Sequence, residues 1–95
     1  MSELEAVRKE IEEIDMEILA LIGKRVNLAE KVLESKKMNG TSINDHKQNE
    51  IVISRALNAA IEHNLDVGLV KAIYEILIRM SIERQNELSG RGSLP

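Results

Sequence analysis

The sequence has no cysteine, no tryptophan and no phenylalanine, and it has one proline and one tyrosine among its 95 residues. The absence of cysteine excludes disulfides, thiolate metal sites and thiol nucleophiles. With almost no aromatic residues, a core has to be built from Ile, Leu, Val, Ala and Met, which suits helices that pack on helices. His46 and His63 are poorly placed for a metal site, so we expect no metal.

The sequence also lacks an excess of basic residues, since 13 Lys and Arg stand against 16 Asp and Glu, a net charge of −3. A nucleic-acid-binding surface needs clustered surplus Lys and Arg, so the composition argues against that class of protein. No apolar run approaches the length of a membrane-spanning helix, and the opening segment MSELEAVRKE is unlike a signal peptide. We therefore expect a cytoplasmic protein that binds neither nucleic acid nor membrane.

Hydrophobic periodicity predicts a very long first helix. Its apolar residues advance in steps of three and four, as on one face of a helix. They are Leu4, Val7, Ile11, Ile14, Ile18, Leu21, Leu28 and Val32. Ser2 and Glu5 form a capping box, and only the isolated Gly23 interrupts the pattern. This helix is therefore expected to run to about residue 38.

Two further helices follow a turn that the segment Asn39–Ser42 predicts. Ser42 or Asn44 is available as the N-cap of the second helix, which is expected over about 44–63. Asp66 can cap a third helix that ends near residue 88. We expect residues 1–90 to form one domain and residues 91–95 to form a disordered tail.

The length of the first helix predicts a dimer. A helix of about 35 residues extends for roughly 50 Å, longer than a globule of 95 residues. Chains this short without disulfides seldom bury enough apolar surface alone. Packing of the long helix along its copy would remove the apolar stripe from water. The predicted fold is therefore all-α, with three helices per chain in an intertwined homodimer.

Several polar residues stand where the helical pattern has apolar ones. Arg25 interrupts the stripe of the first helix, where an isolated guanidinium needs an anionic partner. Lys36 lies three turns later on the same face. Ser81 and Gln85 lie one turn apart on the stripe of the third helix, and Asn49 lies on the inner face of the second. This set predicts a site for a small, anionic, oxygen-rich molecule.

Each of these residues also has a purely structural explanation. Arg25 could form an ion pair, for example with an acidic residue of a partner chain. Lys36 could lie along the surface with its charged end in water. Ser81 and Gln85 would be exposed if the third helix were rotated by a fraction of a turn. The combination of residues, rather than any single one, therefore indicates a function.

Over roughly residues 4–88 the chain resembles the all-helical (AroQ-class) chorismate mutases. The matching segments are LEAVRKEIEEIDMEILALIGKR, NLAEKVLESK, INDHKQNE, EHNLD and SIERQ. Arg8, Asp15 and Arg25 stand at the spacing of the family's opening helix, and Lys36 follows at the family's distance. The resemblance implies the isomerisation of chorismate to prephenate, a step of the shikimate pathway to phenylalanine and tyrosine, without metal or cofactor.

The resemblance further implies a homodimer whose two active sites each take residues from both subunits. Arg25 and the partner's Arg8 would bind the two carboxylates of chorismate, and Ser81 would help to hold the ring carboxylate. Lys36 and Gln85 would contact the ether oxygen of the breaking bond, and with Arg25 they are the implied catalytic residues. Arg8 and Arg25 lie about 25 Å apart along one helix, so antiparallel packing of two chains is needed to bring them together.

The start of the second helix departs from the family pattern. The resemblance implies that Asp45 contributes to the site, partly through its backbone. An arginine and then a glutamate typically follow in the family, whereas this sequence has Gln48 and Asn49. Asn49 can accept a hydrogen bond from the ring hydroxyl of the substrate, although it is shorter and uncharged. The loss of the arginine makes the pocket less cationic.

Two alternatives stay open at the level of sequence. An isochorismate pyruvate lyase shares this fold and acts on an isomer of the same substrate, so its pocket would look similar. A non-catalytic helical dimerisation module would have kept the fold and lost the activity. The products formed from chorismate and isochorismate distinguish these alternatives.

Overall fold

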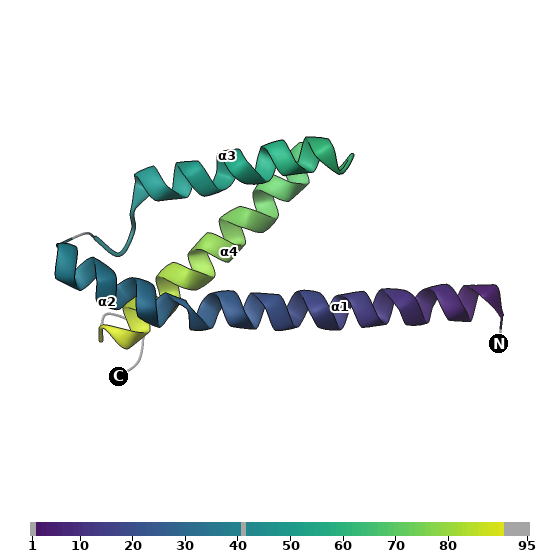
Figure 1. Ribbon diagram of the computed structural model, residues 1–95, viewed down its shortest axis with the longest axis horizontal. Helices are drawn as coiled ribbons and strands as arrows, with labels where there is room; N and C mark the ends of the chain where they lie inside the picture. The colour runs from purple at the N-terminus through teal and green to yellow at the C-terminus, as the bar shows by residue number, and fades with distance from the viewer. Residues whose placement is uncertain (1, 41, 91–95) are drawn as a thin grey trace.

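The chain is entirely helical between short connections in the computed structural model, which describes residues 2–40 and 42–90. Its elements are α1 (Glu3–Asn27), α2 (Ala29–Asn39), α3 (His46–Glu62) and α4 (Val67–Leu88). Helices α1 and α2 lie end to end as one rod, α3 runs roughly alongside the rod at a distance, and α4 crosses from α3 back to the rod (Figure 1). The predicted all-α fold of three helices with a long first one is confirmed.

The rod is interrupted at a single residue, Leu28. Its ψ of −14° departs from the value of about −42° that is usual in an α-helix. The hydrogen bonds from Leu28 N to Lys24 O and from Val32 N to Leu28 O, both 3.1 Å, nevertheless continue across this point. The long predicted helix therefore consists of α1 and α2 joined without a loop.

The helix ends follow the expected capping chemistry, with one correction. Ser2 Oγ accepts a hydrogen bond from Glu5 N at 3.1 Å, and Asp66 Oδ1 accepts one from Leu69 N at 2.8 Å. The N-cap of α3 is Asp45, whose Oδ1 accepts from Gln48 N at 3.2 Å, so the prediction of Ser42 or Asn44 was wrong. The side chain of Asn44 is engaged elsewhere, as described below.

The core is small and consists of one patch on α2 and one on α3, each of which packs against α4. Its buried apolar residues are Ala29, Leu33, Val52, Ala56 and Ala60. Three of the five are alanines, which let helix backbones approach closely. Gln85 of α4 is buried among them at 3% exposure. A core of this size leaves most of the large apolar side chains of the chain outside it.

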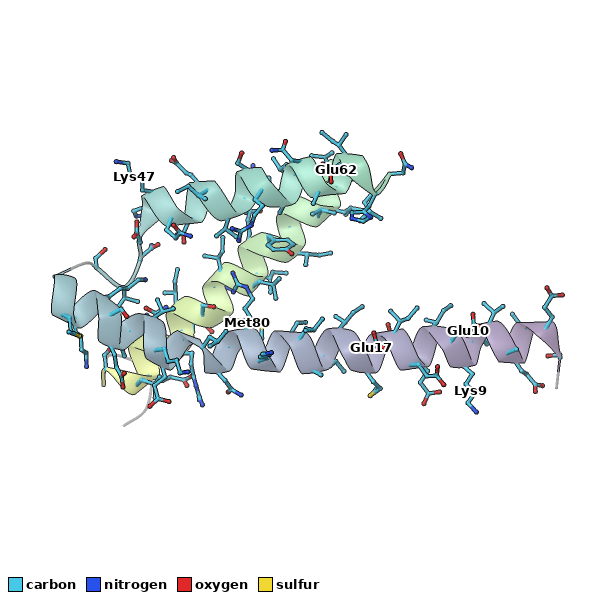
Figure 2. All side chains as sticks on the ribbon, in the orientation of Figure 1. Lys9, Glu10, Glu17, Lys47, Glu62 and Met80 are labelled. Atoms are coloured by element: carbon cyan, nitrogen blue, oxygen red, sulfur yellow. The ribbon has the colours of Figure 1, made fainter. Side chains whose placement is uncertain are left out.

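Helix α1 has no buried residue, and its N-terminal part projects beyond the other helices (Figure 1). Side chains along this part, including Lys9 and Glu10, extend into open space (Figure 2). The radius of gyration is 16.7 Å, compared with about 12 Å for a compact chain of this length. The accessible surface is 7645 Å², compared with about 5,500 Å² for a compact monomer of this mass. Part of this excess lies on α1, none of whose residues is buried.

Within residues 2–40 and 42–90, no helix combines the length and the apolar character needed to cross a membrane. The tail predicted to be disordered, residues 91–95, lies outside the described residues. The assignment of residues 1–90 to one domain stays a prediction.

Candidate active site

A cavity of about 280 Å³ lies where the four helices converge. Its polar lining consists of Arg25, Lys36, Asp45, Gln48, Asn49, Arg55, Ser81 and Gln85. Its apolar lining consists of Leu28, Ala29, Val32, Ile43, Val52, Ile78 and Ile82. The cavity therefore joins an apolar wall to a set of charged and hydrogen-bonding groups, as expected of a site for a small polar ligand.

Arg25, near the end of α1, is held by neutral acceptors of α4. Its NH1 donates to Leu77 O at 3.0 Å and to Ser81 Oγ at 2.8 Å. Within the described part of the chain the one ion pair is that of Arg84 with Glu87, so no carboxylate of this part neutralises Arg25. The guanidinium is thus half-buried and fixed in place, with its charge available to an anion in the cavity.

Gln85 supplies a buried carboxamide from the next turn of α4. Its Nε2 donates to Ser81 O at 3.3 Å, and its Oε1 has no hydrogen-bond partner. An unpaired buried polar atom costs about 1–3 kcal/mol. Rotation of the carboxamide by about 180° exchanges the positions of its oxygen and nitrogen atoms. The side chain can therefore offer either a donor or an acceptor to a ligand. Oε1 is therefore the atom of this side chain that can still accept a hydrogen bond.

Lys36 connects α2 to the loop before α3, because its Nζ donates to Ile43 O. Partial burial lowers the pKa of Lys36, and the nearby Asp45 carboxylate offsets this only in part by raising it. An ammonium group has three donors, so Nζ can keep the bond to Ile43 and still donate to a ligand. Lys36 is therefore a second positioned cation in the cavity wall.

The first turns of α3 bring Asp45 and Asn49 to the cavity, one helical turn apart. Asp45 uses its carboxylate as the N-cap. Asn49 Nδ2 donates to Asn44 Oδ1 at 2.8 Å. The two side chains are thus oriented by the loop and by the helix start.

Six of the seven predicted site residues line this one cavity, namely Arg25, Lys36, Asp45, Asn49, Ser81 and Gln85. The rotation of α4 that would have exposed Ser81 and Gln85 is not observed, because Gln85 is buried and Ser81 is half-buried. Arg8 is exposed and lies about 25 Å from Arg25 along α1, so one chain does not bring these two residues together.

Arg55 lines the cavity and was missed by the sequence reasoning. It lies seven residues, or two turns, after Gln48, and therefore on the same face of α3. This spacing from Gln48 could have indicated in the sequence that Arg55 lines the cavity. Arg55 is exposed and adds a cation to the lining on the side of Gln48.

Comparison with known proteins assigns the chain to a family. The profile of the family described as chorismate mutase type II matches residues 7–86. A chorismate mutase of Methanocaldococcus jannaschii is 38% identical over 78 residues, which are 82% of this chain and 79% of that protein. A 4-amino-4-deoxychorismate mutase of Streptomyces venezuelae is 24% identical over 93 residues, 98% of this chain and 90% of that protein.

A bifunctional chorismate mutase/prephenate dehydratase of Buchnera aphidicola subsp. Schizaphis graminum is 29% identical over 87 residues. The match covers 92% of this chain but 23% of that longer protein. The chain therefore belongs to the type II, all-helical chorismate mutase family. With this membership comes its activity, that of a chorismate mutase, an isomerase of aromatic amino acid biosynthesis. The family and the reaction predicted from the sequence are confirmed.

Proposed function

We propose that two copies of this chain form an antiparallel dimer with two active sites, each of which converts chorismate to prephenate. Each site would combine the cavity of one chain with the partner's Arg8. The observation that carries this proposal is the convergence of Arg25, Lys36, Ser81 and Gln85 on one cavity, where no carboxylate of the described residues pairs with Arg25. A dianionic substrate would supply the missing negative charge.

The reaction needs little beyond restraint and fixed charge. In one step, the C–O bond to the enolpyruvyl side chain breaks as a C–C bond forms within the same molecule, so no external group or proton is exchanged. Arg25 and the partner's Arg8, each bound to one carboxylate, would hold the flexible side chain over the ring in its compact reactive conformer. Ser81, already bonded to Arg25, would assist in holding the ring carboxylate.

Lys36 and Gln85 are proposed to act on the ether oxygen, where negative charge grows as the bond breaks. Lys36 would contribute one of its free N–H donors and also contact a carboxylate. Gln85 would donate the second N–H of Nε2, since the first donates to Ser81 O. Donors fixed in advance stabilise such charge without reorganisation during the reaction.

The proposed dimer is supported by the exposed face of α1. The apolar residues Leu4, Val7, Ile11, Ile14 and Ile18 are 45–57% exposed. The chain exposes about 2,000 Å² more than a compact monomer would, an amount typical of the surface that a subunit buries in an obligate dimer. A two-fold axis near Met16 and Glu17 would place the partner's Arg8 beside Arg25, and would place Ile11 opposite the partner's Ile22.

The direct test uses purified protein, chorismate and no added metal. Loss of chorismate is followed by ultraviolet absorbance, and the product is identified by chromatography. We expect prephenate from the unaltered protein and from Lys24→Ala, a matched control on the same turn of α1, and strongly reduced turnover by Arg25→Ala.

Other products would identify the alternatives. Pyruvate and salicylate from isochorismate, with chorismate unchanged, would indicate a lyase of the same fold. A folded dimer that converts neither compound would be a non-catalytic helical module. A cytoplasmic site of action stays a prediction, which localisation of the protein in its own cells would test.

A further inference from the structure

Asn44, in the loop between α2 and α3, is hydrogen-bonded to a residue of the cavity wall. Ser42 Oγ donates to Asn44 O at 3.0 Å and so fixes the backbone of Asn44. Asn44 Oδ1 accepts a hydrogen bond from Asn49 Nδ2 at 2.8 Å. Asn44 is exposed, whereas Asn49 is half-buried and lines the cavity. The outer residue of the pair therefore orients the inner one.

This hydrogen bond determines what Asn49 offers to a ligand. Because Nδ2 is engaged with Asn44, Oδ1 is the free end of the carboxamide, and an amide oxygen is a neutral acceptor. The charged residues around it are Arg25, Lys36 and Arg55, against the single carboxylate of Asp45. Asn49 is therefore a neutral acceptor in a cavity whose lining carries a net positive charge.

We propose that Asn44 is a positioning residue for Asn49, and that this pair makes the site select a ring hydroxyl over a ring ammonium group on the substrate. The inference rests on the proposed function, in which the ring hydroxyl meets Asn49. A hydroxyl donates to an amide oxygen at a small desolvation cost. An ammonium group leaves water at a much higher cost, which a neutral amide among three cations does not offset.

The test compares chorismate with its analogue that carries an amino group in place of the ring hydroxyl. The measured quantity is the ratio of kcat/KM for the hydroxyl compound to that for the amino compound. Asn44→Ala frees the amide of Asn49 to rotate. We expect the ratio to fall about fivefold, which corresponds to the loss of one neutral hydrogen bond. The change should appear mainly as a higher KM for chorismate. Asn49→Asp places a carboxylate at the same point, and we expect the ratio to fall by at least about tenfold, as for a hydrogen bond to a charged group.

Two further variants distinguish positioning from a general structural effect. Asn44→Asp keeps the acceptor and removes the donor, so it permits only the proposed orientation of Asn49. Its added charge is exposed and lies one side chain further from the substrate than Asn49, and we expect the ratio to stay higher than for Asn44→Ala. Asn58→Ala is the matched control, because Asn58 is an exposed asparagine of the same helix outside the cavity lining, and we expect it to leave the ratio unchanged.

The outcomes separate this inference from the proposed function. An active Asn44→Ala enzyme with the same ratio as Asn58→Ala would show that Asn44 does not position Asn49. A ratio for Asn44→Asp as low as that for Asn44→Ala would show that Asn49 presents its nitrogen instead. Failure of the unaltered protein to convert chorismate would overturn the proposed function itself.

Discussion

The proposed sharing of active sites between two subunits leads to a quantitative prediction for mixtures of two impaired variants. Arg8→Ala and Arg25→Ala would each remove one guanidinium–carboxylate contact, and a hydrogen bond to a charged group contributes about 1.5–3 kcal/mol, so each should lower kcat/KM by at least about tenfold. Arg8 and Arg25 of one chain are about 25 Å apart and serve different sites in the proposed dimer. A mixed dimer would therefore contain one site with both arginines and one with neither.

Random pairing of equal amounts of the two variants makes half of the dimers mixed, so about one site in four is intact. The two proteins are unfolded and refolded together, and the rate of chorismate consumption is measured against each variant refolded alone. We expect the mixture to recover about a quarter of the unaltered activity. The expected recovery of activity is large because pairing of the two variants restores complete active sites.

The matched control is a mixture of Arg25→Ala with Lys36→Ala. Both residues line the cavity of the same chain, so no mixed dimer contains an intact site and no recovery is expected. If Arg8→Ala and Arg25→Ala form mixed dimers, shown by two different affinity tags, and yet recover no activity, the partner does not supply Arg8. Equal recovery in both mixtures would contradict the assignment of Arg25 and Lys36 to one site.

Further predictions concern the ether oxygen, pH, the dimer and the core. Gln85→Ala should lower kcat by at least about a hundredfold, with the fold retained by circular dichroism, since loss of one such donor has this effect in other enzymes. Burial lowers the pKa of Lys36, so its ammonium group should lose its proton at a lower pH than an ordinary lysine does. We therefore expect kcat/KM to fall with rising pH before the pH reaches the usual pKa of lysine. A kcat/KM that stays constant up to that pH would contradict this. Ile14→Glu places a charge on the exposed face of α1 in both chains and should produce monomers in analytical ultracentrifugation, whereas an intact dimer would place the interface elsewhere. Leu33→Ala empties part of the small core and should lower the free energy of unfolding by about 2–4 kcal/mol in urea denaturation.

Local patterns in the sequence were sufficient to predict the helices and their inner faces. The spacing of apolar residues reflects the 3.6-residue period of the helix, so it marked the long rod and placed Arg25, Lys36 and Gln85 on faces directed inward. Ser2 and Asp66 marked helix starts because capping uses a side chain and a backbone N–H only a few residues apart. These features depend on neighbours in the chain, and therefore the sequence alone determined them.

The start of α3 shows where local patterns stop being sufficient. Ser42, Asn44 and Asp45 can all cap a helix, and the sequence does not rank them. In the structure Asn44 is engaged with Asn49, and Ser42 Oγ donates to the backbone of Asn44, which leaves Asp45 as the cap. Hydrogen bonds within the folded loop therefore determine which of the three residues caps α3.

The cavity itself was decided by the tertiary structure. The crossing of α4 over the rod brings Leu77 O and Ser81 to Arg25, more than fifty residues away in the chain, and a backbone acceptor leaves no trace in a side-chain pattern. The same packing brings Arg55 to the cavity. Helical periodicity fixes which face of a helix is apolar, whereas the distance between groups on different helices depends on how those faces pack. Sequence therefore determined which residues could form the site, and only the packing of the helices determined which of them meet.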